Sequence, residues 1–163
     1  MKIYLIGSLR NERIPEIANQ LTEATGHTIF ADWWAPGPEA DDYWKKYEEL
    51  RGFTYLEALN RPAAQHVFHF DKYHLDDSHA AVLVTPAGRS CHLEAGYMVG
   101  RGKPVWVLLS NDEERWDVMY QFCAGVAPSM GHLVELIELY RPPRRDVHEL
   151  LFGDAEVVPA RRG

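Results

Sequence analysis

The sequence contains few cysteines, and this scarcity excludes disulfide-based scaffolds. Cys91 and Cys123 are the two cysteines in 163 residues. They are too few for a disulfide framework, and their spacing is not that of a zinc site. We expect both to be reduced thiols, as is usual in a cytoplasmic protein.

Long apolar runs are also absent. No stretch reaches the roughly 18 consecutive apolar residues that a membrane span needs. The first residues, from Met1 to Ile6, follow a strand pattern and lack the cleavage site of a signal peptide. We therefore expect no association with a membrane.

Basic residues are in the minority. Lysine and arginine together number 17, against 24 aspartates and glutamates, and the formal net charge is −7. Proteins that bind DNA or RNA usually present a basic face, so we expect no nucleic acid polymer as a partner. A local group of arginines is still sufficient to hold a small anionic ligand.

Several familiar motifs are missing as well. No Gly-x-Gly-x-x-Gly follows an expected strand, and there is no Walker P-loop. The Gly-x-Ser-x-Gly nucleophile elbow is absent, which argues against a Ser-His-Asp hydrolase. The eight histidines are scattered, and neither His-Glu-x-x-His nor a pair of closely spaced cysteines occurs. We predict no metal site and no cofactor.

What the chain does contain is an alternation of short apolar runs and amphipathic segments. Its length and its 46% hydrophobic content suit one domain with a substantial core. Strands are predicted at 2–6, 27–31, 80–85, 104–109 and 123–127. Helices are predicted at 11–25, 39–59 with a break near Gly52 and Thr54, 90–100, 112–122 and 129–140, with another starting at Pro62.

This alternation predicts an α/β protein with a doubly wound parallel sheet. Right-handed crossovers restrict the strand order to a flavodoxin-like or a short Rossmann-like arrangement. We assign residues 1–140 to a single domain. The composition changes after Tyr140, and we interpret 141–163 as a C-terminal tail.

The loops after the first three strands should meet at one edge of the sheet, where open α/β folds bind their ligands. They carry the residues that we predict to bind substrate: Gly7, Ser8, Arg10, Asp32, Trp33, Gly88, Arg89 and Ser90. Gly7 allows close approach to the backbone, and Ser90 at a helix start suits a phosphate or carboxylate. Arg89 or Arg10 could close that anion site, although either could equally be a solvated surface residue.

Two adjacent tryptophans follow the second strand. Trp33 and Trp34 lie in a polar loop, where an exposed indole has a hydrophobic cost. One interpretation is that at least one of them covers a ligand, on which a flat base could stack. The other is that both cover the long insertion at 39–77.

Two carboxylates are candidates for catalysis. Glu94 is predicted about one turn into the helix 90–100, where the positive helix terminus favours the ionised form. An ionised glutamate there suits a nucleophile in sugar chemistry, or it could simply complement the helix dipole. Asp71, on the helix before the third strand, could act as the acid/base that accompanies such a nucleophile. It could also be a solvent-facing charge, and Asp76 and Asp77 compete for the same role.

These residues resemble a known family. The segments 3–8, 92–97 and 100–105, together with Asp71 ahead of a strand, are similar to the nucleoside 2-deoxyribosyltransferase superfamily, which includes nucleoside 5′-monophosphate N-glycosidases. The resemblance covers roughly residues 1–140. It implies a flavodoxin-like, five-stranded parallel sheet and a homodimer or higher homo-oligomer with shared sites.

The resemblance also implies roles for three side chains. Glu94 matches the glutamate that attacks C1′ of the sugar and forms a glycosyl-enzyme ester. Asp71 is the best match to the aspartate that assists protonation of the leaving base. Tyr4 matches the first-strand tyrosine that orients the nucleophile. The implied substrate is a nucleoside or a nucleoside monophosphate.

One departure from the family pattern separates its two activities. The transferases carry an acidic residue about six positions before the nucleophile, and Gly88 stands there in this chain. His92 also resembles the nucleotide hydrolases. We therefore predict cleavage of the N-glycosidic bond of a nucleoside 5′-monophosphate or deoxynucleotide. The alternatives are base exchange between deoxynucleosides and, from another class, a non-catalytic nucleotide sensor.

Overall fold

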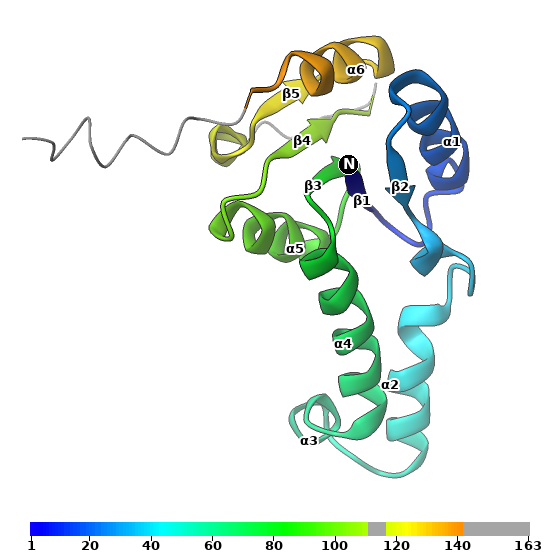
Figure 1. Ribbon diagram of the computed structural model, residues 1–163. Coiled ribbons are helices and arrows are strands. Elements are labelled where there is room, and N and C mark those ends of the chain that lie inside the picture. Colours follow the sequence, from blue (N-terminus) through cyan, green and yellow to red (C-terminus); the bar gives the residue numbers. More distant parts are fainter. Residues whose placement is uncertain (111–116, 142–163) are drawn as a thin grey trace, which may run out of the picture.

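Five parallel strands form one sheet in the computed structural model, which describes residues 1–110 and 117–141 (Figure 1). The strands are β1 (Lys2–Ile6), β2 (Thr28–Phe30), β3 (Ala80–Val84), β4 (Val105–Leu108) and β5 (Gly125–Ala127). Their order is β2-β1-β3-β4-β5, and every neighbouring pair is parallel. This is the flavodoxin-like arrangement, which confirms the predicted fold class.

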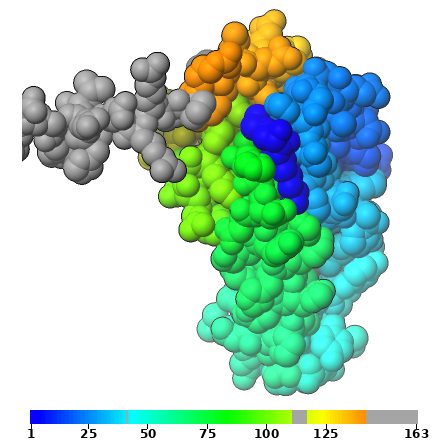
Figure 2. All heavy atoms as spheres, in the orientation of Figure 1, coloured from blue at the N-terminus to red at the C-terminus, as the bar shows by residue number. Residues whose placement is uncertain are grey.

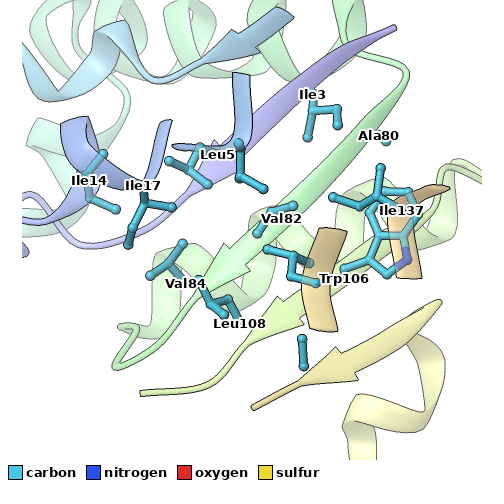
Figure 3. Packing of buried hydrophobic residues seen from close by; sticks show 13 residues of the cluster. Ile3, Leu5, Ile14, Ile17, Ala80, Val82, Val84, Trp106, Leu108 and Ile137 are labelled. Atoms are coloured by element: carbon cyan, nitrogen blue, oxygen red, sulfur yellow. The ribbon is translucent and has the colours of Figure 1, made fainter. Parts of the chain in front are cut away.

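The central strands are apolar throughout because helices cover both faces of the sheet. Every residue of β3 and β4 is buried. On one face, Leu5, Val82 and Trp106 pack with α1 (Ile14–Thr25) and α6 (Met130–Leu139), as Figure 3 shows. On the other face, Tyr4 and Leu83 belong to a second cluster that includes α5 (Arg89–Gly100). Side chains of successive residues in β1 therefore pack on opposite faces of the sheet, and Tyr4 faces α5.

Several helix ends follow from local sequence signals. Gly26 closes α1 in a left-handed conformation, with φ of 65°, and the Ser129 side chain accepts a hydrogen bond from the His132 amide at the start of α6. The start of α1 was predicted too early. Asn11 accepts a hydrogen bond from the Arg13 amide in a turn, and the helix begins at Ile14.

The segment predicted as a helix at 112–122 is different where it is described. Residues 111–116 lie outside the described part of the chain. The rest forms a short 3₁₀ helix, η2 (Val118–Phe122), at whose start the Asp117 side chain accepts a hydrogen bond from the Met119 amide. The predicted tail at 141–163 also lies outside the described residues, apart from Arg141.

The insertion between β2 and β3 forms an arm that projects away from the sheet (Figures 1 and 2). It contains α2 (Ala40–Leu50), α3 (Tyr55–Leu59) and α4 (Pro62–Asp77). The predicted break near Gly52 and Thr54 is confirmed, since Gly52 has φ of 81° and Thr54 forms a capping box with Glu57. No helix in the described ranges is both long and apolar enough to cross a membrane.

A buried ion pair joins two segments of the arm. The Glu48 side chain is 1% exposed and accepts a hydrogen bond of 2.8 Å from Nε of Arg61. Arg51 approaches the same carboxylate oxygen at 3.4 Å, and the Arg61 guanidinium lies 3.7 Å from the centroid of the Phe53 ring. Because a buried charge without a partner is costly, this group ties the start of α4 to α2.

Removing Arg61 should therefore destabilise the fold. We expect Arg61→Met to lower the free energy of unfolding by about 3 kcal/mol, since Glu48 loses its nearest partner and stays buried. Urea denaturation followed by circular dichroism measures the change. The matched control is Lys46→Met, which removes an exposed pair with Glu39 and should cost at most about 0.5 kcal/mol. Equal losses in the two variants would contradict this account of the arm.

Candidate active site

A cavity of about 350 Å³ lies where the carboxyl ends of β1 and β2 meet the root of the arm. This volume falls at the lower end of the roughly 300–1,000 Å³ typical of small-molecule sites. It is lined by Tyr4, Gly7, Leu9, Asp32, Trp33, Pro36, Ala40, Tyr43, His66, Val67, Phe70, Asp71 and Glu94. The sheet edge that the sequence predicted as a binding site is thus one wall of a cavity, and the arm is the other.

The three predicted catalytic residues meet in this cavity from three different elements. Tyr4 comes from β1, Asp71 from α4 and Glu94 from α5. The Tyr4 hydroxyl donates a hydrogen bond of 3.5 Å to Oδ1 of Asp71. A phenol and two carboxylates in one partly enclosed space can combine a nucleophile, an acid/base and a hydrogen-bond donor that orients one of them.

Glu94 lies deeper in its helix than the sequence suggested. It is the sixth residue of α5, because that helix begins at Arg89. The free N–H groups belong to the first four residues, and the effect of the helix dipole is concentrated in the first turn. The helix terminus therefore contributes less to the charge of Glu94 than we expected from the sequence.

The Tyr4 hydroxyl stays protonated. Burial raises the pKa of this phenol far above its ordinary value, and the negative charges of Glu94 and Asp71 raise it further. A neutral phenol remains a hydrogen-bond donor at every pH at which the fold survives. Tyr4 can therefore orient a carboxylate but cannot serve as a base.

Both tryptophans of the loop after β2 are fixed by their indole N–H groups. Trp33 donates to the Leu5 carbonyl oxygen at 2.8 Å, and Trp34 donates to the Asn11 carbonyl oxygen at 3.1 Å. The loop after β2 is thus fastened to β1 and to the loop that follows β1. Trp33 forms a rigid part of the cavity wall, whereas Trp34 packs against the core on the α1 side of the sheet.

Gly7 lines the cavity, but packing also explains why it is a glycine. A Cβ atom at this position would lie 2.6 Å from Cδ1 of Ile14, which α1 places in the core. The Gly7 carbonyl oxygen accepts a hydrogen bond of 3.3 Å from the Cys91 thiol. The loop after β1 is therefore held between α1 and α5.

Ser8 and Arg10, two of the predicted binding residues, do not line this cavity, although both are next to Leu9, which does. The Ser8 hydroxyl oxygen accepts a hydrogen bond from the Arg10 amide. The Arg10 guanidinium is 3.6 Å from the Asp42 carboxylate in the first turns of α2, and the Arg10 side chain is 76% exposed. Leu9 and Tyr43, their neighbours in sequence, line the cavity, so this exposed ion pair joins the loop after β1 to α2 beside two lining residues.

The structure separates the three predicted residues at the start of α5. Gly88 and Arg89 line a broad apolar hollow of about 860 Å³ between α5 and η2, and not the cavity of Glu94. Ser90 lines a third cavity of about 310 Å³, whose wall also includes Asp71 and Glu94. The two carboxylates therefore stand between two cavities, with Ser90 on one side and Trp33 on the other.

His92 lies outside the cavity of Glu94. One of its ring nitrogens is 2.8 Å from the Gly88 carbonyl oxygen, and the other is 3.1 Å from the Tyr120 hydroxyl. It faces the broad hollow of Arg89 and is stacked with the Tyr120 ring. Among the residues of the described ranges, no three histidine, cysteine or acidic side chains are grouped as a metal site would require.

Among the lining residues of the arm, sequence reasoning missed the three that carry aromatic rings, namely Tyr43, His66 and Phe70. A usable signal existed for the two on α4. His66 and Phe70 are four residues apart, as are Val67 and Asp71, so all four share one face of a helix. Tyr43 had no such signal, because its place depends on how α2 packs against α4.

Comparison with known proteins identifies the fold. No family model and no curated protein matches the chain. The solved structure of a CMP N-glycosidase, BcmB, from Clostridium botulinum is similar over 86% of this chain and 100% of its own, with 12% identity and a TM-score of 0.50. A 2-deoxyribosyltransferase from Bacillus psychrosaccharolyticus is similar over 86% of this chain and 93% of its own, with 18% identity and a TM-score of 0.56. The chain has the fold of these two enzymes, as the sequence resemblance implied.

The buried phenol should make stability depend on alkaline pH. The pKa of Tyr4 in the folded protein is raised above its ordinary value of 10.0. The stabilisation that the neutral phenol gives to the folded state is therefore complete below pH 10 and is lost as the pH rises further. We expect Tyr4→Phe to reduce this loss by about 1.4 kcal/mol per pH unit above pH 10. Urea denaturation at about pH 9, 10 and 11 measures this loss of stability.

The control is Tyr55→Phe, which changes a tyrosine that is 67% exposed. This variant should follow the pH dependence of the unmodified protein. If Tyr4→Phe does so too, the phenol of Tyr4 ionises in the folded protein, and the electrostatic description of the cavity is wrong.

Proposed function

We propose that this protein is an enzyme that cleaves the N-glycosidic bond of a nucleoside 5′-monophosphate and releases the free base. The observation that carries the proposal is the convergence of Glu94, Asp71 and Tyr4 in one cavity of about 350 Å³. Paired carboxylates are the usual equipment for cleaving a glycosidic bond through a covalent intermediate. The aromatic walls suit a flat base.

In the first step, the Glu94 carboxylate attacks C1′ and the bond between C1′ and the base nitrogen breaks. The electron pair of that bond leaves with the base, and Asp71, directly or through a water, supplies the proton that neutralises it. This step requires Glu94 to be ionised and Asp71 to be protonated when the substrate binds. The product is an ester between Glu94 and the sugar.

In the second step, water attacks C1′ of the ester. Asp71 accepts a proton from that water, and the Glu94 carboxylate is released. The neutral Tyr4 hydroxyl holds the Asp71 carboxylate in place through both steps. A second base could attack the same ester in place of water, and the reaction would then be a base exchange between deoxynucleosides.

One observation supports an activity of this class, and a second favours hydrolysis. Two solved structures that share the fold are an N-glycosidase and a deoxyribosyltransferase, which supports the class of activity. Gly88 stands where the transferases carry an acidic residue, and Gly88 does not line the cavity of Glu94. No acidic group is thus supplied from this loop to hold a base.

The charges of the cavity suggest how a monophosphate would lie. Its lining includes the carboxylates of Asp32, Asp71 and Glu94, and no lysine or arginine among the described residues lines it. A phosphate inside would meet like charges. We therefore place the base and sugar inside and the phosphate at the rim, beside Ser8 and Arg10. An exposed ion pair such as Arg10–Asp42 is worth little, so Arg10 can exchange partners readily.

We also propose that the protein works as a homodimer that buries the outer face of α5. Leu93 is 75% exposed and lines both the hollow of Arg89 and the cavity of Ser90. The cavity of Ser90 is also lined by the exposed Phe68, and the hollow of Arg89 by the exposed Met119 and Phe122. The apolar surface on both sides of Leu93 is therefore continuous. Monomers seldom leave such a surface open. A second copy there would close the cavity of Ser90 over the two carboxylates.

A cytoplasmic location belongs to the same proposal. Cys91 and Cys123 are free thiols in the structure, as an enzyme of nucleotide metabolism in a reducing compartment would have.

Replacing the nucleophile should abolish base release. We expect Glu94→Gln and Glu94→Ala to lower kcat by about 10³-fold or more, because each removes the group that forms the ester. Chromatography of the free base measures the rate over a panel of ribo- and deoxyribonucleosides and their 5′-monophosphates. The matched control is Glu23→Gln, an exposed glutamate of α1, which should keep full activity. Undiminished release in both Glu94 variants would contradict the mechanism.

The same assay distinguishes the alternatives. Release of base from monophosphates in water supports the hydrolase. Release that occurs only when a second base is added, with formation of a new nucleoside, supports the transferase. Thermal stabilisation by nucleotides without any product supports the non-catalytic sensor.

A charge on the outer face of α5 should dissociate the dimer. We expect the unmodified protein to elute with the mass of a dimer and Leu93→Lys to elute as a monomer in size-exclusion chromatography with light scattering. The control is Leu139→Lys, at a residue that is 74% exposed on α6, across the sheet. A monomeric unmodified protein, or a dimer that survives Leu93→Lys but not Leu139→Lys, would overturn this assignment.

A further inference from the structure

The cavity of Glu94 contains few groups that could recognise a base. Apart from Tyr4, Asp71 and Glu94, the lining side chains that can form hydrogen bonds are those of Asp32, Trp33, Tyr43 and His66. The Trp33 N–H already donates to the Leu5 carbonyl oxygen. Asp32, Tyr43 and His66 are therefore the groups left to contact the polar edge of a bound base.

The aromatic side chains that line the cavity favour one way of holding a flat ring. Trp33, Tyr43 and Phe70 line it with aromatic surface, and Val67 adds an apolar contact. A nucleobase is bound best with its faces against such side chains and its edge toward polar groups. With C1′ beside Glu94, the far edge of the base is the part that remains to be recognised.

Asp32 is well placed for this contact. It begins the short 3₁₀ helix η1 (Asp32–Trp34) directly after β2. Its backbone is held by the hydrogen bonds of the two tryptophans that follow it. Within the described part of the chain, no lysine or arginine forms an ion pair with its carboxylate.

The chemistry of a carboxylate makes Asp32 selective. An ionised carboxylate only accepts hydrogen bonds, whereas a phenol and a neutral imidazole each both donate and accept. Tyr43 and His66 can therefore adapt to an amino or an oxo group on the base. At the exocyclic position of the base, Asp32 can accept a hydrogen bond from an amino group, but it would repel a carbonyl oxygen.

We propose that Asp32 selects amino-bearing bases over their oxo counterparts. Cytosine and adenine carry an exocyclic amino group where uracil and hypoxanthine carry a carbonyl oxygen, so each pair differs at the atom that Asp32 reads. Because Asp32 is exposed, water competes for the contact, and the preference should be about 10-fold to 100-fold rather than the larger factors of enclosed sites. This inference rests on the proposed function.

Matched pairs of substrates test the inference. The rate of base release, as kcat/KM, is measured for CMP against UMP and for AMP against IMP. We expect the unmodified protein to favour the amino member of the better-cleaved pair by about 10-fold or more. Asp32→Asn should bring this ratio close to one, mainly through faster cleavage of the oxo member, because an amide can donate to a carbonyl oxygen.

Two further variants serve as comparisons. Asp32→Ala should lower cleavage of the amino member, because it removes the acceptor, and should raise cleavage of the oxo member less than Asp32→Asn does, because it relieves the repulsion but adds no donor. Glu23→Gln, which removes one negative charge from the exposed face of α1, should leave the ratio unchanged. A ratio that falls equally in Glu23→Gln would show an effect of net charge and would overturn the assignment to Asp32.

Failure of the inference and failure of the proposed function give different results. If the protein releases bases but prefers neither member of a pair, or if Asp32→Asn keeps the ratio, the selectivity does not come from Asp32. If no substrate releases base, the proposed function fails. Dissociation constants of CMP and UMP from calorimetry then test the inference, which requires tighter binding of CMP and a smaller difference in Asp32→Asn.

Discussion

The pairing of β1 with β3 is the constraint on which the site depends. Ile3 to Ile6 run in register beside Ala80 to Leu83, so that two segments more than 70 residues apart end at the same edge of the sheet. The loop after β1 then meets the start of α5, where the Cys91 thiol donates to the Gly7 carbonyl oxygen. Tyr4 faces α5 rather than α1 because side chains alternate along a strand. The first strand and the nucleophile candidate Glu94 are thereby brought into one cavity.

The arm between β2 and β3 supplies what the sheet lacks. A parallel sheet with covering helices offers only an edge, and the face of α4 that carries Val67 and Asp71 turns this edge into a cavity. The ion pair of Glu48 and Arg61 ties the helices of the arm together. The arm then holds a catalytic candidate and five further lining residues in fixed positions, which is the preorganisation that catalysis requires.

The electrostatics divide the site into an interior and a rim. Inside the cavity the ionisable lining groups include three carboxylates, and burial together with these charges keeps the Tyr4 phenol neutral. Arg10, next in sequence to the lining residue Leu9, is paired with Asp42 and lies largely in water. Such a division suits a substrate with a neutral, flat part and a charged end. It also leaves Asp32 as a lining carboxylate that the proposed chemistry at C1′ does not use.

The sequence by itself determined the strands, their parallel arrangement, the glycine end of α1, the break in the arm and the Ser129 cap, because each depends on residues close together in the chain. It also indicated Glu94 and Asp71 through the order of the elements, and Tyr4 through the resemblance to a known family. Only the tertiary structure decided which cavity each side chain enters. Successive residues of a helix point about 100° apart, so Arg89 and Ser90 face different spaces although they are neighbours. The place of Tyr43 likewise depends on the packing of α2 against α4, which no local pattern encodes.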